Sequence, residues 1–278
     1  MPELPEIEAH AERLTEAFAG RILTGFTPLS FTALKTASPA PDAAVGRMID
    51  GVSRRGKYLL IRLGDLSFVV HLMQGGRLEP DTKASARPRG GLARWVFDDG
   101  PALLLTEAGK EKRAGVWVVQ GDPDLVAPLA GLGPEADRLD PATLAQVLET
   151  HSMRLHGLLR DQRAISGIGR RLANEICHRA QLSPFVNASK LGPAEQSRLL
   201  RAIQSCIDES LTFERGRDRM SSSKERPGAV HHRADEPCPV CGDTIRSVEY
   251  ASYTVAYCPT CQTGGRALAD NTTSKFLR

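Results

Sequence analysis

Long hydrophobic runs are absent from this sequence of 278 residues. No stretch approaches about 18 consecutive apolar residues, so neither a transmembrane helix nor a membrane partner is expected. The first residues carry acidic side chains and no apolar segment, which excludes a secretory signal. A cytoplasmic location is therefore predicted, with association with the nucleoid if the source is a prokaryote. The 41% hydrophobic and 25% charged residues are typical of a globular protein of about two domains.

Excess charge of one sign is also small. The 36 Lys and Arg against 33 Asp and Glu leave a net charge of +3, which excludes a histone-like polycation. The distribution is uneven, because residues 151–190 hold seven basic and two acidic side chains, a net charge of +5. A localised basic block of this kind is what an anion-binding surface requires.

Cysteine is scarce, and the six present do not form a disulfide framework. Two of them, Cys177 and Cys206, lie in helical patterns and are expected to be buried thiols. The other four form two C-x2-C pairs separated by 16 residues: Cys238, Cys241, Cys258 and Cys261. This spacing is typical of a structural site for one Zn²⁺, and the residues between the pairs predict a β-hairpin.

The hydrophobic pattern changes from strands to helices along the chain. Helical spacing after Pro5 predicts an N-terminal helix that ends at Gly20. A first domain of strands then ends near residue 130, with strand patterns over 57–63, 67–72, 94–97, 102–105 and 115–120. A linker over 121–142 leads into a helical domain from Pro141. Residues 214–236 are polar and predict a mobile loop.

The first six residues, Met1-Pro2-Glu3-Leu4-Pro5-Glu6, have two interpretations. Removal of Met1 would leave Pro2 with a secondary amine that is partly neutral near pH ~8 and that can form an iminium with an aldehyde. Glu3 would then transfer protons beside it. Alternatively, the two prolines only start a helix, with Glu3 and Glu6 as acids of its first turn.

Further motifs follow in a fixed order: Arg54-Arg55-Gly56-Lys57-Tyr58-Leu59-Leu60, His71-Leu72, Ile165-Ser166-Gly167-Ile168-Gly169, Ala173-Asn174-Glu175 and the cysteine ribbon. With the PELPEIE start, this set resembles the formamidopyrimidine-DNA glycosylase / endonuclease VIII family. The resemblance implies an α+β, multidomain fold with an N-terminal helix and β-sandwich (1–130), a helix–two-turns–helix domain (131–220), and a loop and zinc ribbon (221–278). It also implies a monomer that removes damaged, oxidised bases from double-stranded DNA and cleaves the abasic strand.

By position, the resemblance assigns roles to five residues of the first domain. Pro2 is the nucleophile that forms a Schiff base, Glu3 the acid/base residue, and Lys57 a phosphate-contacting lysine that assists elimination. Glu6 lines the same pocket, and His71 belongs to a turn that contacts DNA. From the residues alone, Lys57 is equally a solvated lysine at a strand end, and His71 equally a core histidine.

The proposed DNA contacts depart from the family pattern. Gly169 precedes a helix inside the basic block, where exposed N–H groups bind phosphate. The family's Asn after this glycine is Arg170 here, and Asn174 lies one helical turn further on. The family's ribbon Arg is Tyr253, which has no bidentate cationic group. We therefore expect weaker phosphate binding at this position and impaired δ-elimination.

The residues that fill the gap left by an extruded base also differ. The family's Met, Arg and Phe become Gln74, Lys112 and Ala114 here, and Arg113 lies between the last two. Gln74 can bond to bases, whereas Ala114 cannot wedge between stacked base pairs. Lesion preference is therefore the least transferable part of the resemblance, and DNA binding is expected to be modest and strongly salt-dependent.

Two other functions remain open from the sequence. The altered positions Ala114, Arg170 and Tyr253 allow a protein that binds lesions or abasic sites with weak or altered catalysis. The zinc ribbon alone allows a protein that acts on RNA or on protein partners, although the N-terminal residues argue against it.

Overall fold

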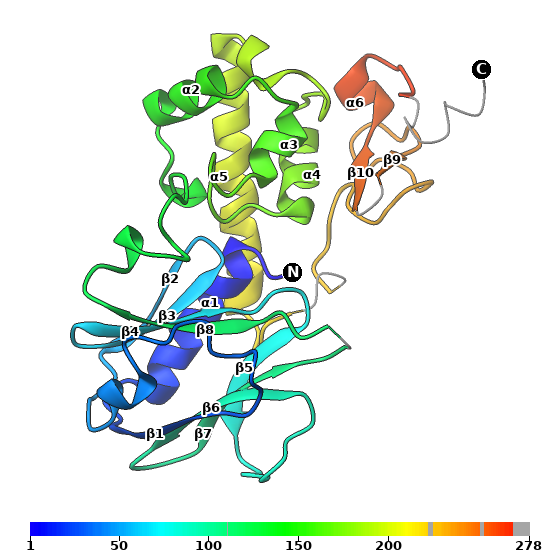
Figure 1. Cartoon of the computed structure of the whole chain (residues 1–278). Coiled ribbons are helices and arrows are strands. Elements are labelled where there is room, and N and C mark those ends of the chain that lie inside the picture. The colour runs from blue at the N-terminus through cyan, green and yellow to red at the C-terminus, as the bar shows by residue number, and fades with distance from the viewer. Residues whose placement is uncertain (110, 222–224, 251–252, 269–278) are drawn as a thin grey trace. The chain divides into compact units, whose positions relative to one another are not determined.

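The computed structural model describes residues 1–109, 111–221, 225–250 and 253–268 (Figure 1). The chain divides into two compact units. The first comprises Met1–Gly131 with Asp218–Met220, and the second comprises Leu132–Arg217 with Ser221–Arg278. Among the described helices, none is long and apolar enough to cross a membrane.

The first unit is a β-sandwich with one α-helix, α1 (Leu4–Phe18). One sheet has the strand order β1-β6-β7-β5 and the other β2-β3-β4-β8, with antiparallel neighbours throughout. The strands are β1 (Leu23–Pro28), β2 (Gly51–Arg55), β3 (Tyr58–Leu63), β4 (Leu66–His71), β5 (Gly76–Asp81), β6 (Gly91–Phe97), β7 (Ala102–Glu107) and β8 (Gly115–Gln120). Short 3-10 helices lie at η1 (Pro41–Ala44) and η2 (Pro123–Leu125).

Aromatic rings join the two sheets in the core of this unit. The ring of Phe68 on β4 lies 5.2 Å from Phe26 on β1 and 5.6 Å from Trp95 on β6, measured between centroids. The helix α1 covers the core with its apolar stripe, since Ile7 and Leu14 are buried. The predicted N-terminal helix and its apolar face are therefore confirmed.

The five predicted strands are confirmed as β3, β4, β6, β7 and β8, with ends shifted by a few residues. A hairpin whose turn includes Asp98, Asp99 and Gly100 joins β6 and β7, with Gly100 at φ +71°. Sequence reasoning missed β1, β2 and β5, which all lie at sheet edges. Edge strands tolerate glycine, proline and exposed polar residues, so β1 (LTGFTP) and β5 (GRLEPD) carry little hydrophobic alternation.

The second unit packs four helices, α2 (Pro141–Thr150), α3 (Leu155–Arg160), α4 (Arg170–Arg179) and α5 (Pro193–Arg215), with 3-10 turns at η3 (Ala136–Arg138) and η4 (Ala188–Lys190). Apolar residues at helical spacing in these helices are buried, as a helical domain requires: Leu144, Val147, Leu148, Leu155, Leu158, Leu159, Leu172, Ile176, Leu199, Ile203 and Ile207. Cys177 and Cys206 are buried as expected. Burial raises the pKa of the Cys206 thiol to about 12, which keeps it protonated.

The same unit ends in a small ribbon. Strands β9 (Arg246–Tyr250) and β10 (Tyr253–Tyr257) pair as the predicted hairpin, and α6 (Pro259–Thr263) follows. The ribbon is attached to the helices by Gln262, whose side chain accepts the Cys258 N–H at 2.8 Å and donates to the Leu182 carbonyl at 3.0 Å.

The mobile loop predicted over 214–236 is wrong for most of its length. Helix α5 continues through Arg215, and residues 225–236 are held against α4. Val230 in this segment has no exposed surface. Polar composition was misleading because the segment is fixed by backbone N–H groups that bond to a carboxylate on another element, which the local sequence does not reveal.

Candidate functional site

The N-terminal acids begin helix α1. Glu3 and Glu6 are each only 4% exposed, and a carboxylate oxygen of Glu6 accepts the Glu3 N–H at 3.0 Å. This bond satisfies one of the donors that a helix start leaves unpaired. The helix therefore begins at Leu4, with Pro5 in its first turn, and leaves Pro2 half-buried just outside it.

Two contacts fix the direction of α1 along β2. In the last turn of the helix, the Thr15 hydroxyl donates to the Val52 carbonyl and accepts its N–H, both at 2.8 Å. Closer to the helix start, Glu8 pairs with Arg54 at 2.5 Å. Residues nearer the start of α1 therefore contact residues nearer the end of β2. The start of the helix and the turn after β2 therefore lie at one end of the sandwich.

Lys57 occupies that turn. It is the second residue of a two-residue hairpin between β2 and β3, after Gly56 at φ +56°. The sequence predicted Lys57 as the first residue of a strand. In the structure it is the last residue of the turn, and β3 begins at Tyr58. Lys57 is only 7% exposed, so its ammonium is held within the protein surface rather than extended into solvent.

His71 lies at the same end, at the close of β4. It is paired with Tyr58 on β3 and with Gly115 on β8, and its Nδ1 accepts the Met73 N–H at 3.2 Å. Burial and then the positive charge of Lys57 lower its pKa to about 4. His71 is therefore neutral near pH 7, which favours the core-histidine interpretation over a cationic contact with DNA.

The two loops that carry Gln74, Lys112 and Arg113 also meet here. The first joins β4 to β5 and the second joins β7 to β8, and Ala108 N–H donates to the Gly75 carbonyl at 3.4 Å between them. Gln74, Lys112 and Arg113 are exposed. The structure thus gathers Pro2, Glu3, Lys57, His71 and these loop residues at one end of the sandwich.

Glu107 shapes the second loop, and sequence reasoning missed it. Its buried carboxylate accepts the N–H groups of Arg113 at 2.6 Å and Ala114 at 2.8 Å. Ala114 is consequently part of the hydrophobic core, whereas Lys112 and Arg113 before it are exposed to solvent. No local pattern distinguishes Glu107 from an ordinary acid at a strand end, because its partners come later in the chain.

The turn before α4 is fixed by Gln162, which the sequence also did not single out. Its side chain accepts the Gly167 N–H at 3.0 Å and donates to the carbonyls of Arg160 and Ile168 at 2.8 Å. Gly167 takes φ +97°, and Gly169 is the N-cap of α4. The predicted glycine turn at a helix N-terminus is thus present, with the half-buried Arg170 as its first helical residue.

Asn174 lies deeper than predicted. It is 1% exposed, and its Nδ2 bonds to Nδ1 of His231 at 2.8 Å. Burial and neighbouring positive groups, His232 first, lower the pKa of His231 to about 3, so this histidine is neutral. In this structure Asn174 therefore holds the segment 225–236 in place rather than facing solvent.

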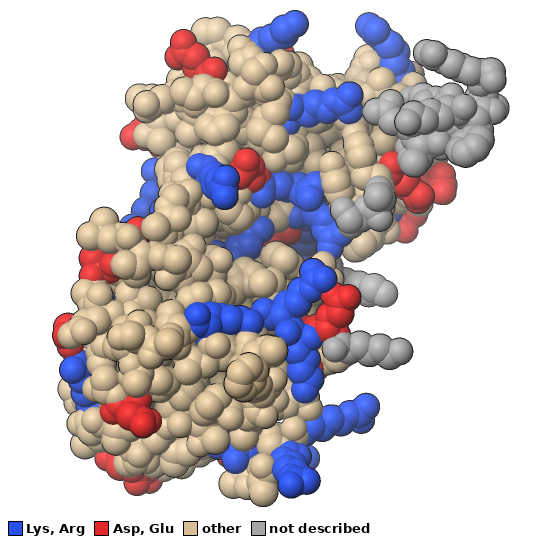
Figure 2. All heavy atoms as spheres, in the orientation of Figure 1, with Lys and Arg blue, Asp and Glu red and all other residues tan. Residues whose placement is uncertain are grey.

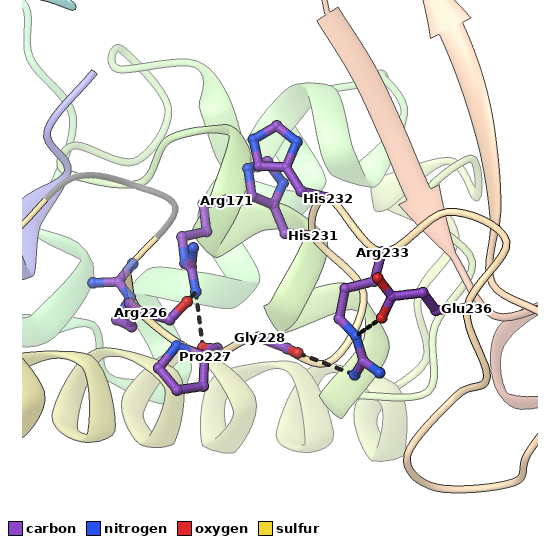
Figure 3. Close-up of a pocket in the computed structure, with 8 residues that line it drawn as sticks. All are labelled: Arg171, Arg226, Pro227, Gly228, His231, His232, Arg233 and Glu236. Carbon is purple, nitrogen blue, oxygen red and sulfur yellow. Dashed lines mark hydrogen bonds and ion pairs between the residues drawn. The ribbon is translucent and has the colours of Figure 1, made fainter.

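That segment and α4 line a pocket of about 740 Å³ that is open to solvent (Figure 3). Arg171 reaches from α4 to the carbonyls of Arg226 and Pro227, while Arg233 bonds to Glu236 at 2.7 Å and to the Gly228 carbonyl at 3.3 Å. The arginines Arg171 and Arg233 therefore hold the backbone of the segment in place.

Glu175 on α4 is the main anchor of this segment. Its carboxylate accepts three consecutive backbone N–H groups, from Ala229 at 2.7 Å, Val230 at 3.1 Å and His231 at 2.8 Å. The motif Ala173-Asn174-Glu175 therefore lies on α4 and attaches to this helix the segment that leads to the ribbon.

Replacing Glu175 with alanine is expected to destabilise the second unit by about 2–4 kcal/mol, because three partly buried donors lose a charged acceptor. Thermal unfolding and hydrogen exchange at residues 229–231 would measure the effect. Glu209→Ala is the control, since Glu209 forms an exposed ion pair with Arg179 that is worth less than about 1 kcal/mol. Equal losses in the two variants would contradict the assignment of Glu175 as an anchor.

The four ribbon cysteines form the predicted metal site. Their sulfur atoms lie within 4.8 Å of one another, with Cys241 to Cys258 at 3.4 Å and Cys238 to Cys261 at 3.9 Å. Tetrahedral Zn²⁺ with Zn–S bonds of about 2.3 Å requires S···S distances of about 3.8 Å. The donor set therefore fits one structural zinc ion and leaves no open position for catalysis.

Tyr253 lies at the start of β10, where its ring stacks on Tyr250 at 4.6 Å between centroids. The guanidinium carbon of Arg160 lies 3.9 Å from the centre of the Tyr253 ring. On the face drawn in Figure 2, Lys and Arg side chains are spread over the helical unit, with few acidic side chains beside them. The basic block predicted from the sequence thus includes a cation placed against the ribbon.

The burial of His10 predicts that the folded protein loses stability in acid. His10 on α1 bonds through Nε2 to the Leu78 carbonyl at 2.8 Å, and burial lowers its pKa to about 4. An unfolded histidine has a pKa near 6.5, so between about pH 6.5 and 4 the unfolded chain binds a proton that the folded chain does not. Stability contributed by His10 is present above pH 6.5 and is lost as the pH falls.

We expect the lowered pKa of His10 to reduce the free energy of unfolding by about 2 kcal/mol as the pH falls from 7 to 4.5. His10→Gln should unfold with a shallower dependence of melting temperature on pH than the wild type over this range. His151→Gln, at a partly exposed position, should keep the wild-type slope. The same slope in all three proteins would contradict the prediction.

Comparison with known proteins places these features in context. Residues 1–112 match the family model of the formamidopyrimidine-DNA glycosylase N-terminal domain, and residues 130–222 match that of its H2TH domain. Residues 235–264 match a zinc finger found in FPG and IleRS. A formamidopyrimidine-DNA glycosylase of Chloroflexus aurantiacus is 34% identical, covering 94% of this chain and 98% of the relative.

Solved structures agree with this comparison. The MutM (Fpg) protein of Thermus thermophilus is 29% identical, with a TM-score of 0.80 over 96% of this chain and 100% of its own. A Lactococcus lactis Fpg in complex with DNA that contains an abasic site has a TM-score of 0.81 at 21% identity, over 94% of this chain and 99% of its own. The latter supports the fold.

Proposed function

The chain belongs to the formamidopyrimidine-DNA glycosylase family, and on that premise we propose how its own residues divide the work. It is a DNA glycosylase of base excision repair with abasic-site lyase activity, and its substrate is damaged DNA. The observation that supports the assignment of residues is the gathering of Pro2, Glu3 and Lys57 at one end of the β-sandwich.

Pro2 is the proposed nucleophile. After loss of Met1, its amine lone pair forms a bond to C1′ of the damaged nucleotide while the bond from C1′ to the base breaks, and the base leaves with a proton. Opening of the sugar ring gives an iminium that withdraws electrons from C2′. Loss of a C2′ proton then expels the 3′ phosphate by β-elimination, which cleaves the strand.

Glu3 and Lys57 support this sequence of steps. The Glu3 carboxylate, buried beside Pro2, transfers the protons that ring opening and elimination require. Lys57, held in its turn, offers a fixed cation to a phosphate next to the lesion. Glu6 acts by capping α1, and His71, neutral and bonded to Met73 N–H, shapes the turn that carries Gln74.

The remaining residues bind the duplex. Gly169 and Arg170 present the N-terminus of α4 to a phosphate, as the geometry of the glycine turn favours. Gln74, Lys112 and Arg113 contact the bases or backbone at the extruded nucleotide. Oxidised bases are the proposed lesions, and we propose a cytoplasmic location, with association with the nucleoid if the source is a prokaryote.

Borohydride trapping across a panel of duplexes tests this function. Purified protein is mixed with duplexes that carry an abasic site, an oxidised purine, an oxidised pyrimidine or no lesion, and borohydride is then added. We expect a covalent complex with abasic DNA and with at least one oxidised base, and none with intact DNA. Tight binding without any covalent complex would instead support a lesion-binding protein.

A further inference from the structure

A stacked set of rings and cations joins α3 to the ribbon hairpin. Tyr250 and Tyr253 end one strand and begin the next, and their rings lie at 12° to each other. The guanidinium of Arg160, the last residue of α3, lies over the Tyr253 ring, 3.9 Å from its centre. Arg154, the N-cap of α3, donates from Nη1 to the Tyr250 hydroxyl at 3.2 Å.

These two arginines differ from others of the same unit. Arg179, Arg217 and Arg233 each form an ion pair with a glutamate. Within the described residues, no carboxylate lies within 4.0 Å of the guanidinium of Arg154 or Arg160. In this part of the chain, both side chains therefore contact tyrosines in place of a carboxylate counter-ion.

The Tyr253 ring restrains the guanidinium of Arg160, whose central carbon lies over the ring. A cation over an aromatic face is attracted by the ring quadrupole, and arginine favours a parallel arrangement. In such an arrangement the N–H groups at the edge of the plane point away from the ring and suit the two oxygens of a phosphate. Since His156 lies 6.1 Å from the Tyr253 ring, in a parallel orientation, the stack is supported from α3 as well.

We propose that Arg160, oriented by Tyr253, binds a phosphate of the DNA backbone and supplies the cation of the ribbon hairpin. This inference rests on the proposed function, since it names a DNA contact for the same enzyme. It also changes the expectation from the sequence that Tyr253 weakens phosphate binding. The tyrosine supplies the aromatic support, and the positive charge comes from another element, 93 positions earlier in the chain.

Affinity for a duplex that carries a tetrahydrofuran abasic analogue tests the proposal. This analogue has no aldehyde and forms no Schiff base, so binding is measured independently of trapping. Arg160→Ala is expected to weaken binding by about 10- to 100-fold and to lower the slope of log K against log salt by about one. Arg160→Lys keeps the charge without the planar group and should lie between the two proteins.

Tyr253 and a second arginine provide the controls. Tyr253→Leu is expected to weaken binding by about as much as Arg160→Ala, and Tyr253→Phe, which keeps the aromatic face, should restore affinity relative to Tyr253→Leu. Arg201→Ala removes an exposed charge from α5 and should change affinity by less than about two-fold. Zinc content and melting temperature show that each variant is folded.

The outcomes separate this proposal from the proposed function. Wild-type affinity and an unchanged salt slope in Arg160→Ala would overturn the phosphate contact, whatever the result of trapping. Loss of affinity in Arg160→Ala but not in Tyr253→Leu would overturn the role of the stack. Absence of trapping by the wild type would overturn the catalytic assignment and leave the binding measurements to decide the role of Arg160.

Discussion

Blocking the amine of Pro2 is expected to abolish borohydride trapping and to reduce strand cleavage at abasic sites by at least about 1,000-fold. A short extension that keeps Pro2 in a peptide bond achieves this without changing any side chain. The amide nitrogen of such a chain has no lone pair available for C1′, so neither the Schiff base nor the iminium can form. Met1 retained on the natural chain would have the same effect.

Three measurements make this prediction sharp. Intact-protein mass identifies the fraction of chains that begin at Pro2, and trapping should scale with that fraction. The same extension placed at the C-terminus is the matched control and should leave trapping at the wild-type level. Affinity for the tetrahydrofuran duplex then shows whether the blocked protein still binds.

Trapping by the blocked protein would contradict the prediction. It would indicate that another amine attacks the sugar, and Lys57 would be the first candidate because it lies at the same end of the sandwich. Reductive trapping followed by peptide mapping would distinguish these two amines directly.

Removal of zinc is expected to unfold the ribbon and to weaken DNA binding by about 100-fold or more. Structural zinc contributes about 10–16 kcal/mol of apparent binding free energy in small zinc modules at pH 7, far more than a hairpin of ten paired residues can replace. Loss of the ribbon would also remove Tyr253 from Arg160 and the bond from Gln262 to the Leu182 carbonyl.

Cys258→Ser tests this expectation, because Cys258 is a ligand with no exposed surface. The variant should contain less than the one zinc ion per chain expected of the wild type, and hydrogen exchange in β9 and β10 should accelerate. Cys206→Ser is the control, since Cys206 is a buried thiol on α5 outside the cluster. A variant at Cys258 that keeps its zinc and its affinity for DNA would show that the site is not needed for binding.

Local patterns predicted the parts of the fold in which apolar residues recur at the spacing of a helix or strand and are buried along one face. Helix α1, the helices of the second unit and the ribbon hairpin follow from apolar spacing, and the zinc ligands follow from two short spacings. The strands at sheet edges were missed because β1, β2 and β5 bury only part of their side chains.

Contacts between distant residues were not predictable in the same way. Glu107 and Glu175 look like ordinary surface acids in the sequence, yet each accepts two or more backbone N–H groups from a later segment. Ala114 aligns with the family residue that wedges between base pairs, and the structure places it in the core, with its N–H bonded to Glu107. No spacing in the sequence identifies such partners, because the tertiary structure brings them together and they do not belong to one helix or strand.

The sequence by itself determined the metal ligands, because these depend on residue type and short spacing. Its ordered motifs, through their resemblance to a known family, also indicated the class of the protein and Pro2 as the candidate nucleophile. Only the tertiary structure decided that Lys57 and the loops of Gln74 and Lys112 lie at the same end of the sandwich as Pro2. It also decided that the guanidinium of Arg160 lies over the ring of Tyr253. The physical reason is that stacking and hydrogen bonding act over a few ångströms, whatever the distance along the chain.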